Sequence, residues 1–169
     1  MMREDDVIEV LGYLGAAGVE VWLDGGWGVD ALIGEETREH DDLDVVIALN
    51  QSGAAQEALW RLGFASVEDE LPTRFVMRDN TDRRIDFHTV TFDSEGGGIQ
   101  QLQDKTSFRY PPEGFTAWGR VGGRRVRCLT AEVQVLCHVG YEPDQNDRHD
   151  MRLLHDHFGI ALPAPYYMN

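Results

Sequence analysis

The sequence predicts an α+β protein, and three observations support this prediction. The chain has 169 residues, of which 42% are hydrophobic and 27% charged, as in ordinary globular domains. Apolar residues near the N-terminus recur with helical spacing, whereas short runs rich in β-branched residues fill the middle of the chain. Glycines separate these segments at turn positions. A chain of this length fits one domain with a substantial core, or one domain with a small appendage.

The first half of the chain is expected to alternate between helices and strands. Its elements are a helix at 5–17, a strand at 19–23, a helix at 27–33, a strand at 43–49 and a helix up to Leu62. Gly18 and Gly34 follow the first two helices at the position where glycine commonly ends a helix. Asn50 and Ser52 are candidate caps of the third helix.

The second half adds strands and then two helices. Its strands are expected at 64–68, 74–78 and 84–92, and at 118–121 and 124–129 around the hairpin turn Gly122-Gly123. We expect 100–114 to form a loop. Helices follow at 130–140 and at 146–157. This order indicates a mixed sheet with helices on one side.

The charge of the chain excludes several kinds of partner. Fifteen Lys and Arg oppose thirty Asp and Glu, so the formal net charge is −15. Such a chain repels nucleic acid and anionic membrane surfaces, whereas it suits a small cationic ligand. A nucleotide would have to arrive with a divalent cation. Cys128 and Cys137 lack metal-ligand spacing, and no apolar run approaches the roughly 18 residues of a membrane span, so we expect a reducing, cytoplasmic location.

Two carboxylates mark the start of the second strand. Side chains alternate between the faces of a strand, so Asp42 and Asp44 share one face while Leu43 and Val45 share the other. Like charges at this spacing repel each other, and a divalent cation that binds both removes the repulsion. Oxygen ligands of this kind suit Mg²⁺. A solvated edge strand would show the same pattern, so the pair alone does not decide the matter.

Further residues strengthen the interpretation of this region as a site. Asp86 lies on another predicted strand and is expected to ligate a metal or to accept a proton as a general base. Gly25 and Gly26 precede a helix start, where free backbone N–H groups attract phosphate. Arg38 is a candidate partner for a phosphate oxygen.

Three segments together resemble a known family. They are WLDGGWGVDALIGEETREHDDLDVVI from Trp22, IDFH from Ile85, and VRCLTAEVQVLCHVGYEPDQNDRHDMRLL from Val126. The Gly-Gly, helix, Asp-x-Asp and later Asp are typical of the polymerase-β-like nucleotidyltransferases. The full segments closely resemble the small lincosamide nucleotidyltransferases and, more distantly, the aminoglycoside 2″-adenylyltransferases. Between about residues 92 and 119 the correspondence is absent, and we expect this segment to shape the acceptor pocket.

The resemblance implies a role for each matched position. Gly25 and Gly26 would cradle the triphosphate, with Arg38 and His40 beside it. The remaining site residues would be the Mg²⁺ ligands Asp42 and Asp44, and Asp86 as a third ligand or general base. The implied enzyme uses two Mg²⁺ ions and transfers AMP from ATP to a hydroxyl of a cationic antibiotic, most simply a lincosamide. The implied fold has a nucleotidyltransferase domain at 1–129 and a helical part at 130–169, and a homodimer is compatible with it.

Alternatives remain open at this point. The same chemistry could act on an aminoglycoside, another metabolite or a protein. A non-catalytic nucleotide-binding relative would be expected to lack an acid or a motif glycine, yet all are present. A metal-dependent phosphohydrolase would usually cluster histidines, whereas the six histidines here do not gather near Asp42 and Asp44 in the sequence.

Overall fold

The computed structural model describes residues 1–166, which form nine strands and five α-helices in the described part of the chain. The helices are α1 (Glu4–Ala16), α2 (Gly25–Ile33), α3 (Ser52–Trp60), α4 (Ala131–Cys137) and α5 (Gln145–Phe158). The strands are β1 (Trp22–Asp24), β2 (Asp42–Ala48), β3 (Ala65–Glu70), β4 (Arg74–Arg78), β5 (Arg84–Phe92), β6 (Gly98–Gln101), β7 (Ser107–Tyr110), β8 (Trp118–Val121) and β9 (Arg124–Arg127). Among the described residues, no helix has the length and apolarity that crossing a membrane requires.

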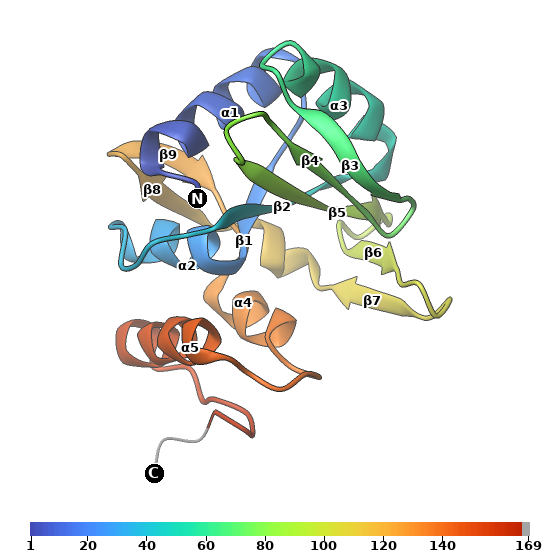
Figure 1. Ribbon diagram of the computed structural model, residues 1–169. Helices are drawn as coiled ribbons and strands as arrows, with labels where there is room; N and C mark the ends of the chain where they lie inside the picture. The colour runs from blue at the N-terminus through green and yellow to red at the C-terminus, as the bar shows by residue number, and fades with distance from the viewer. Residues whose placement is uncertain (167–169) are drawn as a thin grey trace.

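A mixed sheet forms the centre of the molecule (Figure 1). Its order is β1-β2-β5-β4-β3, and β6 and β7 extend it from the end of β5. The β2–β5 pair is parallel, whereas the β1–β2, β4–β5 and β3–β4 pairs are antiparallel. The separate β8–β9 hairpin turns at the predicted Gly122-Gly123 pair. The predicted α+β class with a mixed sheet is therefore confirmed.

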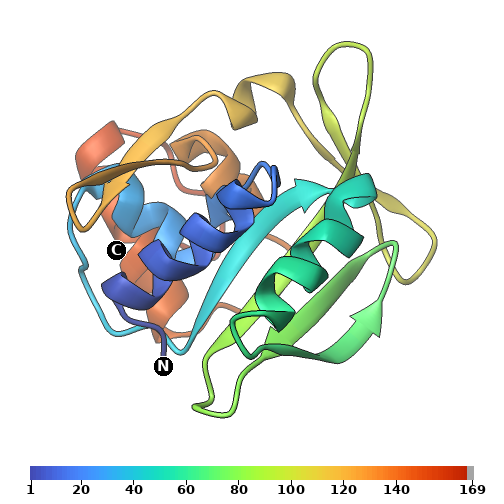
Figure 2. The same ribbon diagram turned by 90° about the horizontal axis from the view of Figure 1, so that it is seen from above.

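One face of the sheet is apolar and is covered by α1 and α3, which lie across it in Figure 2. Alternation along each strand produces this face, because every second side chain points the same way. The buried cluster joins strand residues to Val7, Val10 and Leu14 of α1 and to Leu59 of α3. Its strand members are Leu43, Val45, Ile47, Phe75, Met77, Ile85 and Phe87.

The opposite face is divided between a second apolar cluster and a row of acids. Trp22, Val46 and Val90 pack there against Tyr110 and Phe115. The acids occupy the ends of β1, β2 and β5, where apolar packing stops. The functional site is thus built on the face that α1 and α3 do not cover.

The C-terminal helices differ from the expectation of helices on one side of the sheet. α1 and α3 do share one face, but α4 and α5 lie beyond α2, on the other side of the molecule (Figure 1). A third apolar cluster holds them there, in which Val29 of α2 packs with Val135 of α4 and Met151 and Leu154 of α5. α4 and α5 therefore lie on the side of the acid-bearing face and do not add to the layer formed by α1 and α3.

The segment expected to be a loop at 100–114 is partly β-structure. Residues of β6 pair with Thr91 and Phe92 of β5, and β6 pairs in turn with β7. These strands have four residues each, with the sequences GIQQ and SFRY. Such short, polar runs carry little periodic signal, and their pairing with β5 supplies the stability that the local sequence lacks.

Candidate active site

Strand pairing brings three acids into one row. Asp24 at the end of β1 lies opposite Asp44 of β2, and Asp44 lies opposite Asp86 of β5. His88 follows Asp86 on the same face, and ligand atoms of Asp44, Asp86 and His88 all lie within 4.8 Å of one another. Asp42 precedes Asp44 on that face and pairs in register with Arg84. The sheet thus gathers carboxylates that are far apart in the sequence.

The clustering changes the protonation of these groups. Burial, together with the charge of Asp44, raises the pKa of Asp42 to about 6. Burial likewise raises the pKa of Asp24 and of Asp86. For His88 burial acts in the opposite direction, but the contact with Asp44 and the surrounding carboxylate charges outweigh it and raise the pKa to about 9. The carboxylates therefore repel one another, and a bound cation would relieve that repulsion.

The carboxylate of Asp86 is only half satisfied by the protein. Its Oδ2 atom accepts a hydrogen bond of 2.7 Å from Nη1 of Arg74, which also forms ion pairs with Glu68 and Glu70. Its Oδ1 atom is buried and has no hydrogen-bond partner among residues 1–166. An unpaired buried carboxylate oxygen beside two further carboxylates is a donor set that suits a hard divalent cation such as Mg²⁺.

The glycine pair brings the start of α2 against these acids. Gly25 has a φ of +56°, and an added Cβ would lie 2.5 Å from Oδ2 of Asp44. A Cβ on Gly26 would clash with Nη2 of Arg38 and lie 2.6 Å from Cε1 of His40. Glycine is therefore required at both positions. The backbone N–H groups that begin a helix are thereby placed next to the carboxylates, where a phosphate group could bind both a cation and the helix end.

Arg38 and His40 occupy different environments. Arg38 lines the cavity, and its Nε and Nη2 atoms donate hydrogen bonds of 2.9 and 2.6 Å to the two carboxylate oxygens of Asp150 on α5. His40 is 3% exposed, and its Nε2 atom lies 2.6 Å from Oδ2 of the equally buried Asp30. Arg38 is thus close to the expected phosphate position, whereas His40 lies behind Gly26 and supports the loop.

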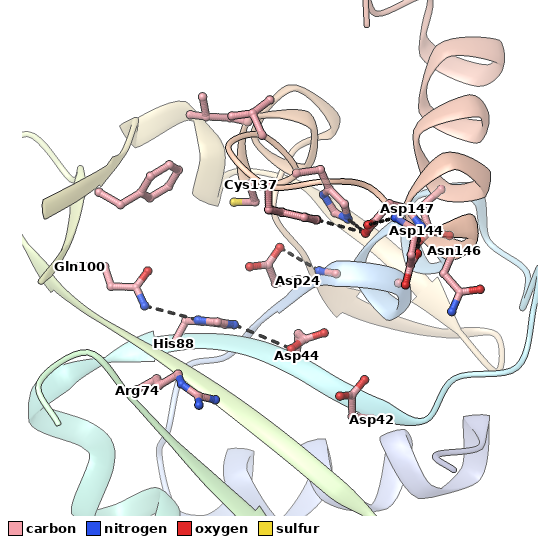
Figure 3. Close-up of a pocket in the computed structure, with 18 of the residues that line it drawn as sticks. Asp24, Asp42, Asp44, Arg74, His88, Gln100, Cys137, Asp144, Asn146 and Asp147 are labelled. Carbon is pink, nitrogen blue, oxygen red and sulfur yellow. Dashed lines mark hydrogen bonds and ion pairs between the residues drawn. The ribbon is translucent and has the colours of Figure 1, made fainter. Parts of the chain in front are cut away.

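An open cavity of about 610 Å³ is lined by Asp24, Asp42 and Asp44 of the acid cluster. Figure 3 shows Asp24, Asp42, Asp44 and His88 on one side of it and Asp144, Asn146 and Asp147 on another. Side chains from the β6–β7 hairpin and the end of α4 complete the walls: Gln100, Leu102, Phe108, Tyr110, Leu136, Val139 and Tyr141. The cavity therefore joins an anionic floor to partly apolar walls.

Several cavity residues were not predicted as site residues. Asp24 joins the site because β1 pairs with β2, and its alternation with Trp22 and Leu23 was the available signal. Gln100 belongs to the segment that was expected to be a loop. His138 and Tyr141, at and just beyond the end of α4, also line the cavity.

The geometry agrees with comparisons to known proteins. The family described as aminoglycoside-2″-adenylyltransferase matches residues 6–154. The chain belongs to this family.

Two named relatives resemble this adenylyltransferase over different shares of their length. A lincosamide resistance protein of Staphylococcus haemolyticus is 26% identical over 153 residues, which cover 90% of this chain and 94% of the relative. A 2″-aminoglycoside nucleotidyltransferase of Klebsiella pneumoniae is 29% identical over 121 residues, covering 72% of this chain but only 64% of that protein.

Solved structures give the same picture of the adenylyltransferase fold. A lincosamide antibiotic adenylyltransferase with bound lincomycin superposes with a TM-score of 0.81 at 25% identity, covering 90% of this chain and 96% of that one. A 2″-aminoglycoside enzyme in complex with adenylyl-2″-tobramycin has a TM-score of 0.75 at 21% identity, covering 92% and 89% of the two chains, and supports the fold. The predicted nucleotidyltransferase activity is confirmed by the family, and a nucleotide is its implied substrate.

Proposed function

We propose that this enzyme transfers AMP from Mg-ATP to a hydroxyl group of a lincosamide antibiotic and thereby inactivates it. The observation that carries the proposal is the row formed by Asp24, Asp44 and Asp86 beside the Gly25-Gly26 start of α2. Asp24 and Asp44 line one cavity with the two glycines. The acceptor class rests on the lincosamide relative, whose length the chain matches almost completely. The aminoglycoside relative has about a third of its length outside the match.

The carboxylates fit a divalent metal. Asp42, Asp44 and Asp86 supply hard oxygen ligands, and the buried Oδ1 atom of Asp86 lacks any other partner in the described structure. We assign Mg²⁺ to these residues, with two ions as the family resemblance implies. When bound, the metal neutralises phosphate charge and aligns the attacking and leaving oxygens.

The remaining steps follow from the chain's own groups. The start of α2 at Gly25 and Gly26 binds the triphosphate, which would share the Gly25 N–H with Oδ1 of Asp24, its acceptor at 2.8 Å in the structure. Arg38 lies beside the two glycines to contact a phosphate oxygen. Asp86 accepts the proton of the acceptor hydroxyl. The hydroxyl oxygen forms a bond to the α-phosphorus while the bond from that phosphorus to the bridging oxygen breaks, and pyrophosphate leaves with the electron pair.

The far side of the cavity suits an amphipathic acceptor. Leu136 and Val139 are 40% and 39% exposed, and Leu102 and Phe108 line the cavity with them. Asp144 and Asp147 add negative charge near the start of α5. A molecule with sugar hydroxyls, a protonated amine and an apolar part would satisfy all of these groups.

Pyrophosphate release from Mg-ATP tests the proposal, with lincomycin, clindamycin, kanamycin or no acceptor. Release only with the lincosamides, together with AMP-modified drug in a mass spectrum, is the expected result. Release with kanamycin but not with the lincosamides would identify an aminoglycoside as the acceptor instead. Release with neither drug, despite measured Mg-ATP binding, would reject the antibiotic acceptor while leaving the nucleotide site intact.

A further inference from the structure

Asp30, in the second turn of α2, is a buried carboxylate that holds one loop. Its side chain is 1% exposed, and its Oδ1 atom accepts a hydrogen bond of 2.6 Å from the hydroxyl of Thr37. Its Oδ2 atom accepts a hydrogen bond of 3.0 Å from the backbone N–H of Thr37 and lies 2.6 Å from Nε2 of His40. Both oxygens of this carboxylate therefore contact residues on either side of Arg38.

The loop that Asp30 holds has little regular structure of its own. It begins at Gly34, whose left-handed backbone conformation ends α2, and it continues to the start of β2. Residues 34–41 contain no helix or strand, and their one β-bridge joins His40 to Met2. A loop of this kind samples many backbone conformations unless specific bonds fix it. Because one carboxylate holds both residue 37 and residue 40, the segment that carries Arg38 is fixed at both ends.

α2 thereby connects the two candidate phosphate-binding groups. Its first residues, Gly25 and Gly26, lie beside the acids, and Asp30 follows about one turn further along the same helix. A helix holds groups in fixed relative positions more accurately than a loop does. The position of the Arg38 loop relative to the helix start is therefore set by Asp30. The guanidinium accordingly lies so close to Gly26 that a Cβ there would clash with Nη2.

α5 contacts the same loop through two adjacent residues. Asp150 accepts the two hydrogen bonds from the Arg38 guanidinium, and Nε2 of His149 lies 3.1 Å from Oγ1 of Thr37. The Thr37 hydroxyl has a single proton, which it donates to Asp30, so it can only accept a hydrogen bond from His149. α5 packs on α2, as Figure 1 shows, so both helices that hold the loop belong to one packed unit.

We propose that Asp30 and Thr37 are positioning residues for the nucleotide, which hold the Arg38 guanidinium beside the start of α2 before ATP binds. The inference rests on the proposed function, because it takes Arg38 as the contact of a phosphate oxygen. Arg38 lines the cavity whereas Asp30 and Thr37 do not, so these two residues act through Arg38. Without their hydrogen bonds the nucleotide would have to order the loop itself, and its affinity would fall by the free energy that the lost bonds supplied.

Calorimetric titration of the full-length protein with Mg-ATP, without an acceptor, tests the inference. Thr37→Val removes the hydroxyl and keeps a branched side chain at a half-buried position. We expect the affinity for Mg-ATP to fall by about 10-fold, which corresponds to the loss of one hydrogen bond to a charged group. Thr37→Ser keeps the hydroxyl and should restore wild-type affinity. Thr37→Ala should show the same loss if the valine variant does not fold.

Thr81→Val is the matched control. Thr81 likewise donates hydrogen bonds of 2.9 Å from its backbone N–H and from its hydroxyl to one buried carboxylate, that of Asp79, but neither residue lines the cavity. Its affinity for Mg-ATP should equal that of the wild type, with circular dichroism confirming that each variant is folded at the temperature of the titration.

Two kinds of result would overturn the inference. The first is an equal affinity for Mg-ATP in the wild type and Thr37→Val, and the second is a loss in Thr37→Ser or Thr81→Val as large as in Thr37→Val. A wild type that binds no Mg-ATP would reject the proposed function together with the inference. Failure of the antibiotic acceptor alone would leave these titrations unchanged, so the two failures are distinguishable.

Discussion

The ion pair between Arg38 and Asp150 allows a quantitative prediction of stability. The Asp150 side chain is 2% exposed, and in the described part of the chain both of its oxygens accept hydrogen bonds only from Arg38, whose side chain is 19% exposed. Arg38→Met would therefore leave a buried carboxylate without a partner. Breaking a buried pair from this side costs about 3–5 kcal/mol, out of a total free energy of unfolding of about 5–15 kcal/mol.

The reverse substitution should cost less. In Asp150→Asn the arginine is left without its counter-charge, but it keeps a hydrogen bond of 3.1 Å to the Glu39 carbonyl and has access to water. The expected loss is about 1–2 kcal/mol. Replacing both residues by Met and Leu removes the unpaired charge and should recover most of the loss in Arg38→Met.

Urea unfolding followed by circular dichroism measures these differences. Arg61→Met is the matched control, because Arg61 and Glu57 form an ion pair in which both side chains are about two-thirds exposed, at 66% and 67%. That substitution should change the free energy of unfolding by less than about 1 kcal/mol. Equal losses in Arg38→Met and Asp150→Asn would refute the reasoning, since it depends on the unequal exposure of the two side chains.

The remaining predictions concern the acid row and the glycine beside it. Asp44→Asn should abolish nucleotidyl transfer while circular dichroism stays unchanged, because it removes a metal ligand and no core packing; full activity would reject the metal assignment. Asp86→Asn should lower kcat by roughly 10²-fold, as expected for loss of a general base, whereas a change confined to nucleotide affinity would reject the base role and leave Asp86 as a metal ligand alone. The raised pKa of Asp42, about 6, means that the folded state binds a proton more tightly than the unfolded state. Without metal, the contribution of Asp42 to stability should therefore fall as the pH rises from about 4 to 6, while Mg²⁺ affinity should rise over the same range. A contribution of Asp42 to the melting temperature that grows with pH, or a Mg²⁺ affinity that falls with pH, would contradict this sign. Gly26→Ala should weaken ATP binding, measured by calorimetry, because its Cβ displaces the neighbouring guanidinium. Gly53→Ala, in open space on α3, should instead raise stability by about 0.5–1 kcal/mol.

Much of the fold could be predicted because its central elements are locally encoded. The alternation of Asp42, Leu43, Asp44 and Val45 identifies β2 and its two faces, and β4 and β5 carry similar patterns. The hairpin β6–β7 was missed because its polar strands depend on pairing with the end of β5. Long-range pairing of this kind leaves little trace in a window of ten or fifteen residues.

The site was predictable to the extent that its chemistry follows from single strands. Asp42, Asp44 and Asp86 could be proposed from their types and spacing, and the sheet places Asp44 and Asp86 side by side. Asp24 carries only the weaker signal of its alternation with Trp22 and Leu23, since its place beside Asp44 depends on the antiparallel pairing of β1 with β2. His40 appears in the sequence as a polar neighbour of the acids, but its burial against Asp30 results from the path of the loop around Gly26.

The parallel β2–β5 register joins two properties that usually vary independently. Leu43 pairs with Ile85 and Asp44 pairs with Asp86, so the same alignment sets both the interior and the acid row. A slip by one residue would expose apolar side chains and separate the carboxylates at once. Substitutions that change this register are therefore selected against because they also disrupt the core. New acceptor preferences would have to arise in the β6–β7 hairpin and the α4–α5 segment. Substrate range can evolve in these walls while the chemistry beneath them stays fixed.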